Sequence, residues 1–270
     1  MTANGKNVVV TGGASGIGAA IARRFAAAGA ASIGIADLDL PAAQVFADRL
    51  ASEIGIRTLA LAVDVCRADA VGAMVSDFER ALGPIDVMCS NAGVFQPLGA
   101  LDTDRSWELN WNVNVMGNVH VARAVLPGML QRGSGYLLLT CSGAGLLANM
   151  DAPYMVSKHA AVAYAEWLAI QYRGKGIGVS ALCPLGVRTP LITRAIAQQT
   201  AALAGVLAGG DLIEPEAVAQ CALEGLMAGT FLILPHEAVR ERMMLKARDR
   251  DGWIASMQKQ YGLDAESASG

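Results

Sequence analysis

Residues 7–18, Asn-Val-Val-Val-Thr-Gly-Gly-Ala-Ser-Gly-Ile-Gly, decide the fold of this 270-residue chain. The short apolar run Val8–Val10 is typical of a strand that is buried on both faces. Beyond the glycines, apolar side chains recur every four residues from Ile17 to Phe25, which predicts one stripe of a helix. Gly29 ends that pattern. The glycines therefore fill the turn that leads from a buried strand into a helix.

The glycines of this turn have the spacing of a phosphate cradle. Gly12 allows a tight turn, Gly16 lets the backbone approach a diphosphate, and Gly18 lets the helix pack on the strand. The helix N-terminus adds free N–H groups and partial positive charge. A plain glycine-rich turn is the alternative in a chain with 30 glycines, but the strand-to-helix position favours a dinucleotide. We therefore expect cofactor contacts from Gly12, Ser15, Gly16, Ile17 and Gly18.

Working outward, apolar runs alternate with helical patterns along the rest of the chain. Strands are predicted at residues 32–36, 58–63, 85–90, 136–141, 178–183 and 230–234. Helices are predicted near residues 41–54, 68–81, 104–131, 153–173 and 214–228. This order indicates an α/β fold, a doubly wound, seven-stranded parallel sheet with helices on both faces.

The chain shows no internal repeat and no linker, so a single domain is expected over residues 1–236. Residues 186–213 form a long insertion between a strand and a helix, which is typical of a substrate lid. Residues 237–270 form a C-terminal extension with one or two predicted helices.

Composition excludes several classes of protein. Hydrophobic residues make up 53% and charged residues 17%, which excludes a disordered chain. No run of 18 apolar residues occurs, so no membrane span is expected. The net charge of −3 argues against nucleic-acid binding. The N-terminus enters a predicted strand at once, leaving no room for a signal peptide.

The cysteines and histidines lack the spacings of disulfide or metal sites. The five scattered cysteines are typical of small apolar core residues, in a protein of a reducing, cytoplasmic compartment. His120, His159 and His236 lack ligand spacing, so no metal is expected.

Asp37 ends the second predicted strand, about twenty residues after the glycines. A carboxylate there accepts hydrogen bonds from both ribose hydroxyls and repels a 2′-phosphate. Its neighbours Leu38 and Ala14 cannot neutralise a phosphate. Asp37 could instead cap the next helix, but Asp39 is better placed for that. We therefore expect NAD, not NADP.

Tyr154 and Lys158 lie four residues apart in a helical pattern and so share one face. A free tyrosine has a pKa of about 10 and is a poor base, but a nearby cation favours the phenolate. Ser142 ends the fifth predicted strand, at the reactive edge of an open α/β sheet. The alternative interpretation is that Tyr154 and Lys158 are only a solvent-exposed pair on the surface of a helix.

Taken in order, these motifs resemble the short-chain dehydrogenase/reductase family, over about residues 5–234. Thr11 to Gly18 matches its T-G-x-x-x-G-x-G pattern. Further matching segments are Asp64-Val65, Asn91-Ala92-Gly93, Asn114 to Gly117, Ser142 to Gly145, Tyr154 to Lys158 and Pro184 to Thr189. Leu185 replaces the glycine that usually follows Pro184. Leu234-Pro235-His236 replaces the usual glycine-rich ending, which puts the family's tetramer contact in question.

The resemblance implies a Rossmann-type fold and an NAD-dependent alcohol dehydrogenase or ketone reductase. Tyr154 would exchange the hydroxyl proton, Ser142 would bond the oxygen, and Lys158 would hold the ribose while favouring the phenolate. Asn114 would support a water path for the proton. It further implies adenine contacts from Asp64 and Val65, cofactor contacts from Asn91, Ala92 and Gly93, and nicotinamide contacts from Pro184, Val187 and Thr189. A homodimer or homotetramer is implied, built on the helices that carry Asn114 and Tyr154.

Only the apolar character of the segments around the motifs limits the range of possible substrates. The lid is rich in Ala and Leu, and Val94, Phe95, Leu146, Leu147 and Met150 are apolar. A hydrophobic secondary alcohol or ketone, such as a steroid, terpenoid or arylalkyl alcohol, fits them, although these residues could equally pack the lid. The main alternative function is an NAD(H)-binding regulator on the same fold. The Tyr–Lys spacing disfavours a C=C reductase, and the lack of a large C-terminal substrate domain disfavours a sugar-nucleotide epimerase.

Overall fold

Seven parallel strands form one sheet in the order β3-β2-β1-β4-β5-β6-β7, as predicted. The computed structural model describes residues 2–95, 103–148, 152–197 and 212–260. The chain moves outward in opposite directions from β1 and β4, so a topological switch point lies between them. The strands are β1 Asn7–Thr11, β2 Ser32–Asp37, β3 Arg57–Ala62, β4 Val87–Ser90, β5 Gly135–Thr140, β6 Ile177–Leu182 and β7 Leu232–Ile233.

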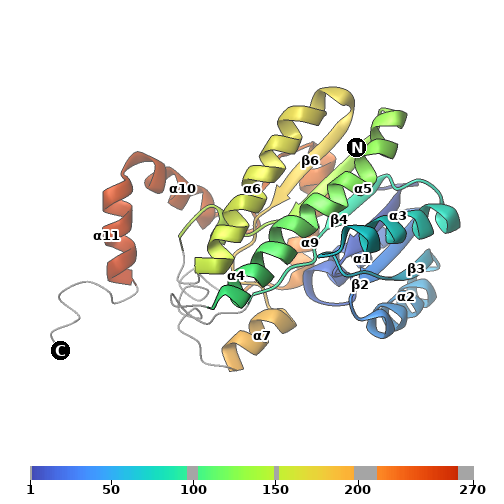
Figure 1. The fold of residues 1–270 in the computed structure, drawn as a ribbon, viewed down its shortest axis with the longest axis horizontal. Helices are drawn as coiled ribbons and strands as arrows, with labels where there is room; N and C mark the ends of the chain where they lie inside the picture. Colours follow the sequence, from blue (N-terminus) through green and yellow to red (C-terminus); the bar gives the residue numbers. More distant parts are fainter. Residues whose placement is uncertain (1, 96–102, 149–151, 198–211, 261–270) are drawn as a thin grey trace.

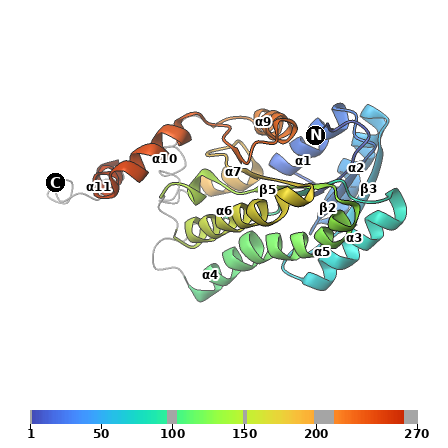
Figure 2. The ribbon, with the colours of Figure 1, turned by 90° about the horizontal axis from the view of Figure 1, so that it is seen from above.

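Helices cover both faces of the sheet (Figures 1 and 2). One face carries α1 Gly16–Ala27, α2 Leu40–Ile54 and α9 Pro215–Ala228. The other carries α3 Ala68–Leu82, α5 Gly117–Arg132 and α6 Ala152–Tyr172; α4 Asp104–Trp111 packs beside α6. Each face has its own apolar core: Val8 and Val10 pack toward α1, and Val9 packs toward α3. This split explains why β1 is apolar at successive positions.

The single helix predicted over residues 104–131 is wrong in one respect. A π-helical turn, Asn112–Met116, separates α4 from α5. The turn shifts the backbone hydrogen bonds, and Asn118 Nδ2 donates to the carbonyl of Asn114 over 2.7 Å. Single π turns of this kind are rare inside α-helices and are frequent at functional sites.

The predicted lid begins beside the sheet edge with α7, Pro190–Ala197. Its two ends meet, because Val187 and Ile213 form a parallel bridge. Arg188 Nε also pairs with Glu214 Oε1 over 2.7 Å on an exposed surface. Residues 198–211 of the lid, and Met150, lie outside the described residues.

The C-terminal helices α10 Ala238–Arg248 and α11 Arg250–Gln260 extend from one end of the molecule (Figures 1 and 2). Val239 and Trp253 are buried and cluster with Leu147, which follows Ser142 in the chain. Lys246 Nζ donates to the carbonyl of Leu146 over 2.7 Å. The extension therefore packs against the loop after β5. Residues 261–270 lie outside the described part.

The cysteines only partly fit the predicted core role. All five are free; Cys89, Cys141 and Cys183 are buried, whereas Cys66 and Cys221 are half-buried. Burial raises the pKa of the Cys66 thiol to about 11. Among the described residues no helix has the length and apolarity to cross a membrane, and no cluster of three or more metal-ligating side chains occurs.

Candidate active site

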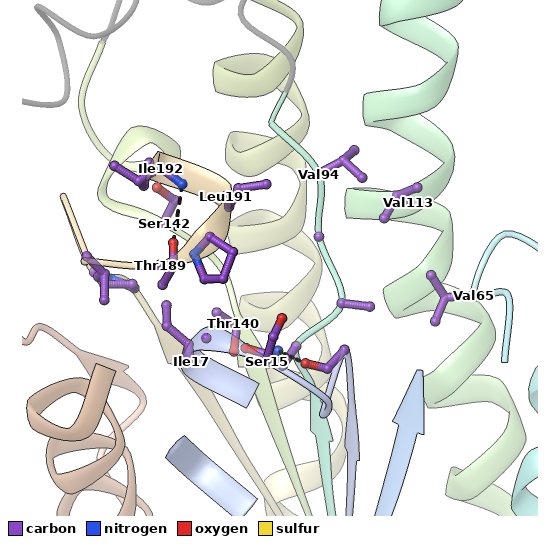
Figure 3. A pocket seen from close by; sticks show the side chains of 18 of the residues that line it. Ser15, Ile17, Val65, Val94, Val113, Thr140, Ser142, Thr189, Leu191 and Ile192 are labelled. Atoms are coloured by element: carbon purple, nitrogen blue, oxygen red, sulfur yellow. Dashed lines mark hydrogen bonds between the residues drawn. The ribbon is translucent and has the colours of Figure 1, made fainter. Parts of the chain in front are cut away.

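A cavity of about 480 Å³ lies along the carboxyl edge of the sheet. Its walls come from the loops after the first six strands, from the π turn at Asn112–Met116, from α6 and from the start of α7. Figure 3 shows Ser142, Thr189 and Ile192 on one side of the cavity and Val94 and Val113 on the other. This is the position at which open α/β sheets bind ligands.

The glycine turn lines part of the cavity. Gly12, Ser15, Gly16 and Ile17 line it, whereas Gly18 does not. Gly12 and Gly16 have φ values of 61° and 53°, in the left-handed region that favours glycine. A Cβ on Gly12 would lie 2.9 Å from Ala92 Cα. Ser15, the N-cap residue of α1, makes no side-chain capping hydrogen bond. The turn thus offers an open backbone cradle beside a helix N-terminus.

Gly18 allows close packing of α1 on the glycine turn and does not line the cavity. A Cβ there would overlap the carbonyl of Gly12 and lie 2.6 Å from Asn91 Nδ2. Gly18 therefore lets α1 sit directly under the turn, as the glycine spacing predicted.

Asp37, the last residue of β2, and Asp39, two residues later, have different partners. Asp37 lines the cavity, and its Oδ2 accepts from the Ala14 amide of the glycine turn over 3.0 Å. Asp39 Oδ1 accepts from the Ala42 amide over 3.0 Å and caps α2. The helix cap is therefore Asp39, and Asp37 is directed toward the turn. Leu38, beside it on the lining, is 77% exposed.

The N-A-G segment after β4 is tied to β1. Thr11 Oγ1 accepts from the amides of Asn91 and Ala92 over 3.0 and 3.1 Å. Asn91 Nδ2 lies 3.1 and 3.2 Å from the carbonyls of Thr11 and Gly12. These contacts cross the switch point and align the two loops. Asn91, Ala92 and Gly93 all line the cavity, as do Asp64 and Val65 from the loop after β3.

Asn114 lies behind the cavity wall and does not line it. Its Oδ1 accepts from the Val94 amide over 3.0 Å, and its Nδ2 donates to the Val94 carbonyl over 3.1 Å. A Cβ on Gly93 would lie 3.2 Å from Asn114 Oδ1 and 3.5 Å from Lys158 Nζ. The buried Asn114 side chain therefore fixes the backbone of the N-A-G segment beside Lys158.

Ser142, Tyr154 and Lys158 all line the same cavity. Lys158 is 4% exposed, and its Nζ lies 5.7 Å from the centroid of the Tyr154 ring. Ser142 Oγ accepts from the Ala144 amide over 3.1 Å. The buried Phe95 ring, expected in the substrate wall, meets the Tyr154 ring edge-on, with centroids 4.9 Å apart. A hydroxyl, a phenol and an ammonium thus share one cavity.

The loop after β6 closes the other side of this cavity. Pro184, Val187 and Thr189 line it, together with Leu185. The Gly143 amide donates to the Pro184 carbonyl over 2.7 Å and joins this loop to the loop of Ser142. Thr189 Oγ1 accepts from the Ile192 amide over 3.4 Å (Figure 3).

Sequence reasoning missed several lining residues. Some of them follow directly after strands, so the rule that ligands bind at carboxyl strand ends could have found them; Val113 lies on the unforeseen π turn. The missed residues are Val63, Val113, Thr140, Cys141 and Pro190.

One of them, Cys141, has a lowered pKa, because it contacts the Cys183 thiol and lies near the Lys158 cation.

Comparison with known proteins gives consistent results. Residues 6–200 match the family model described as short chain dehydrogenase. A 1-deoxy-11-beta-hydroxypentalenate dehydrogenase from Streptomyces exfoliatus is 36% identical, over 87% of this chain and 84% of that protein. A 3beta-hydroxysteroid dehydrogenase 2 from Eggerthella lenta is 33% identical, over 80% of this chain and 86% of that protein.

Solved structures share the same architecture. A short-chain dehydrogenase/reductase from Burkholderia phymatum, crystallised in complex with NAD, superposes with a TM-score of 0.83 at 29% identity. The match covers 93% of this chain and 96% of the other. A short-chain type dehydrogenase/reductase from Mycobacterium marinum gives a TM-score of 0.79 at 27% identity, over 86% and 94% of the two chains.

Proposed function

This chain belongs to the short chain dehydrogenase family, and on that premise we propose that it is an NAD-dependent oxidoreductase of hydrophobic secondary alcohols and the matching ketones. The observation that carries the proposal is the shared cavity of Ser142, Tyr154 and Lys158 with the glycine turn. Backbone that can bind a diphosphate and acid–base side chains line one cavity, the arrangement that hydride transfer to a dinucleotide requires.

The residues present fit a nicotinamide dinucleotide. Gly12 and Gly16 leave an open backbone turn where a side chain would intrude, and Asp37 stands at the end of β2. The Asp37 carboxylate would bond the adenosine ribose hydroxyls and repel a 2′-phosphate. The bond from the Ala14 amide already holds that carboxylate in place. NAD is therefore the proposed cofactor.

The acid–base chemistry falls to three side chains of the cavity. Tyr154 takes the hydroxyl proton of the alcohol, or returns it to the ketone in the reverse reaction. Ser142 donates a hydrogen bond to the same oxygen as charge develops there. Lys158 places a positive charge beside the Tyr154 ring, which favours the phenolate. When bound, the nicotinamide would supply the hydride acceptor. Asn114 acts indirectly, by fixing the wall at Val94.

An apolar substrate suits the catalytic end of the cavity. Val94, Val113, Leu185, Leu191 and Ile192 line it there. Two relatives are named as dehydrogenases of a hydroxypentalenate and a 3beta-hydroxysteroid, which agrees with a hydroxyl group as the reacting centre. A steroid, terpenoid or arylalkyl alcohol is therefore the proposed substrate class.

A homodimer or homotetramer is the proposed assembly. Trp107 and Trp111 on α4 and Trp167 on α6 are 39%, 45% and 48% exposed. These helices belong to the same outer layer as α5 (Figure 2). Large exposed aromatic side chains on one layer favour burial against a second copy.

Deuterium transfer tests the proposed reaction directly. The protein would be incubated with NAD and 1-phenylethanol, borneol or a 3β-hydroxysteroid, each deuterated at the carbinol carbon. We expect deuterium in NADH from at least one alcohol, with slower turnover than for the protio compound. NAD binding without transfer from any secondary alcohol would favour a regulator that only binds the dinucleotide.

A further inference from the structure

The hydrogen-bond ladder between β6 and β7 ends at a side chain. Its last backbone bond runs from the Cys183 amide to the Ile233 carbonyl over 2.9 Å. Pro184 has no N–H, so the next donor is the Leu185 amide. That amide donates to Nδ1 of His236 over 3.2 Å, across 51 residues of sequence. The imidazole thus takes the place of a backbone carbonyl in the ladder.

The segment held by His236 is a wall of the cavity. Pro184 and Leu185 both line it. On their other side, the Gly143 amide donates to the Pro184 carbonyl over 2.7 Å, and Gly143 follows Ser142 in the chain. The Leu185 side chain covers Gly143 so closely that a Cβ on Gly143 would overlap it. A displacement of the Leu185 backbone would therefore move Pro184 and its hydrogen-bond partner Gly143, which is bonded directly to Ser142 in the chain.

The hydrogen bond fixes the protonation of the ring. Because the Leu185 amide donates to Nδ1, that nitrogen carries no proton, and the neutral ring holds its hydrogen on Nε2. Nε2 is buried without a hydrogen-bond partner in the part of the chain that the structure describes. Protonation of Nδ1 would set two N–H groups against each other and break the bond.

Burial lowers the pKa of His236, and the Gly186 backbone acts in the opposite direction. Cys183 directly after β6, Glu237 and Lys246 contribute no charge interaction to this shift. The ring is therefore neutral at pH 7 and becomes charged only on the acid side of 6.5, the ordinary value for histidine.

We propose that His236 is a positioning residue for hydride transfer, which holds the wall at Pro184 and Leu185 in register with Ser142. The inference rests on the proposed function. His236 touches neither substrate nor cofactor in this account; it acts through the Leu185 backbone. Neutral His236 holds the wall, and charged His236 releases it.

Two substitutions separate the hydrogen bond from the rest of the side chain. In His236→Asn, the amide oxygen stands as many bonds from the backbone as Nδ1, so it accepts from Leu185 but does not titrate. His236→Ala removes the acceptor. Thr58→Val is the matched control, because it deletes one side-chain bond to a carbonyl, that of Ala47, far from the cavity.

Amide hydrogen exchange of residues 183–188 at pH 7 tests the placement without any substrate. We expect the Leu185 amide to exchange about tenfold faster in His236→Ala, and at the wild-type rate in His236→Asn and Thr58→Val. Unchanged exchange in His236→Ala overturns the inference, whatever the protein catalyses.

Reduction of acetophenone by NADH tests the consequence for catalysis. We expect kcat to fall about tenfold in His236→Ala while KM for NADH changes less than about threefold, and His236→Asn to restore kcat. In ketone reduction Tyr154 donates a proton, and low pH keeps its phenol protonated, so acid does not impair this step. A fall in kcat below pH 6.5 is therefore expected from His236, and it should be absent in His236→Asn.

The two readouts distinguish the possible failures. Faster exchange in His236→Ala with wild-type kcat and an unchanged pH profile overturns the positioning role. A wild-type protein that reduces neither acetophenone nor any ketone of the alcohol panel overturns the proposed function, and the role in hydride transfer with it.

Discussion

Lys158 on α6 donates a hydrogen bond to the backbone carbonyl of Thr140 over 3.1 Å, at the end of β5. The bond joins the helix that carries Tyr154 to the strand that leads into Ser142. One buried side chain thereby sets the relative position of the three groups to which we assign the chemistry.

Replacement of Lys158 by Met should remove the charge and this bond together. We expect turnover to fall at least about 100-fold, since a preorganised charge at a reacting centre contributes several kcal/mol. Steady-state kinetics measures the loss. Lys175→Met is the matched control, because Lys175 Nζ lies 5.1 Å from the Tyr172 ring centroid on an exposed surface. Equal effects of the two substitutions would contradict the assignment.

Asp37 and Asp39 should separate cofactor choice from helix capping. Asp37→Ala is expected to weaken NAD binding by about tenfold, the value of one hydrogen bond to a charged group, and to relax discrimination against NADP. Asp39→Ala should cost about 1 kcal/mol of stability and leave cofactor preference unchanged. Titration calorimetry measures the affinities for NAD and NADP, and urea unfolding measures the stability. A wild-type preference for NADP would refute our interpretation of Asp37.

Gly18 should tolerate no side chain. Because a Cβ there would overlap the Gly12 carbonyl, Gly18→Ala is expected to destabilise the protein by about 1–3 kcal/mol and to weaken NAD binding. Gly72→Ala on α3 is the control, since nothing lies within 4 Å of its Cβ position. It should stabilise by up to about 1 kcal/mol. Urea unfolding compares them, and a neutral Gly18→Ala would contradict the close packing.

The contact between Lys246 and His159 predicts a pH dependence of stability. His159 Nε2 faces Lys246 Nζ at 3.4 Å, and burial, followed by the Lys246 charge, lowers the pKa of His159. The folded state therefore takes up this proton at lower pH than the unfolded state does. Stability should be full above about pH 6.5 and fall as the pH drops below it.

His159→Gln tests this dependence, since its amide can still accept from Lys246 but cannot titrate. We expect its free energy of unfolding to fall less between about pH 7 and pH 5.5 than that of the wild type. His236 contributes in the same direction, so part of the fall should remain. Identical curves for the wild type and His159→Gln would show that His159 does not carry the effect.

The sheet and most of the cavity could be predicted from sequence because their signals are local. Buried parallel strands are continuous apolar runs, and the ends of parallel strands share one edge. The glycine turn, Asp37 and the Tyr154–Lys158 pair could therefore be assigned to one site. Asn114 was predicted to support a water path for the proton, and that role stays a prediction; its side chain forms hydrogen bonds with the backbone of Val94.

The remaining features depend on contacts between distant segments. The bond from Leu185 to His236 spans 51 residues and has no motif. The π turn at Asn112–Met116 is one short turn within a longer helical segment, and a helical pattern over residues 104–131 does not resolve it. Trp107 is as apolar as a core residue, and only the packing of α4 shows that it is exposed.

Tyr154→Phe tests the central claim most directly, because it removes one oxygen and leaves the ring packed against Phe95. The alcohol that transfers deuterium to NAD would be assayed with the wild type, Tyr154→Phe and the control Tyr164→Phe. Tyr164 lies on the same helix, with its ring stacked on Trp167. We predict unchanged NAD affinity and a loss of turnover of at least about 100-fold in Tyr154→Phe alone. Turnover close to that of the wild type in Tyr154→Phe would contradict the account.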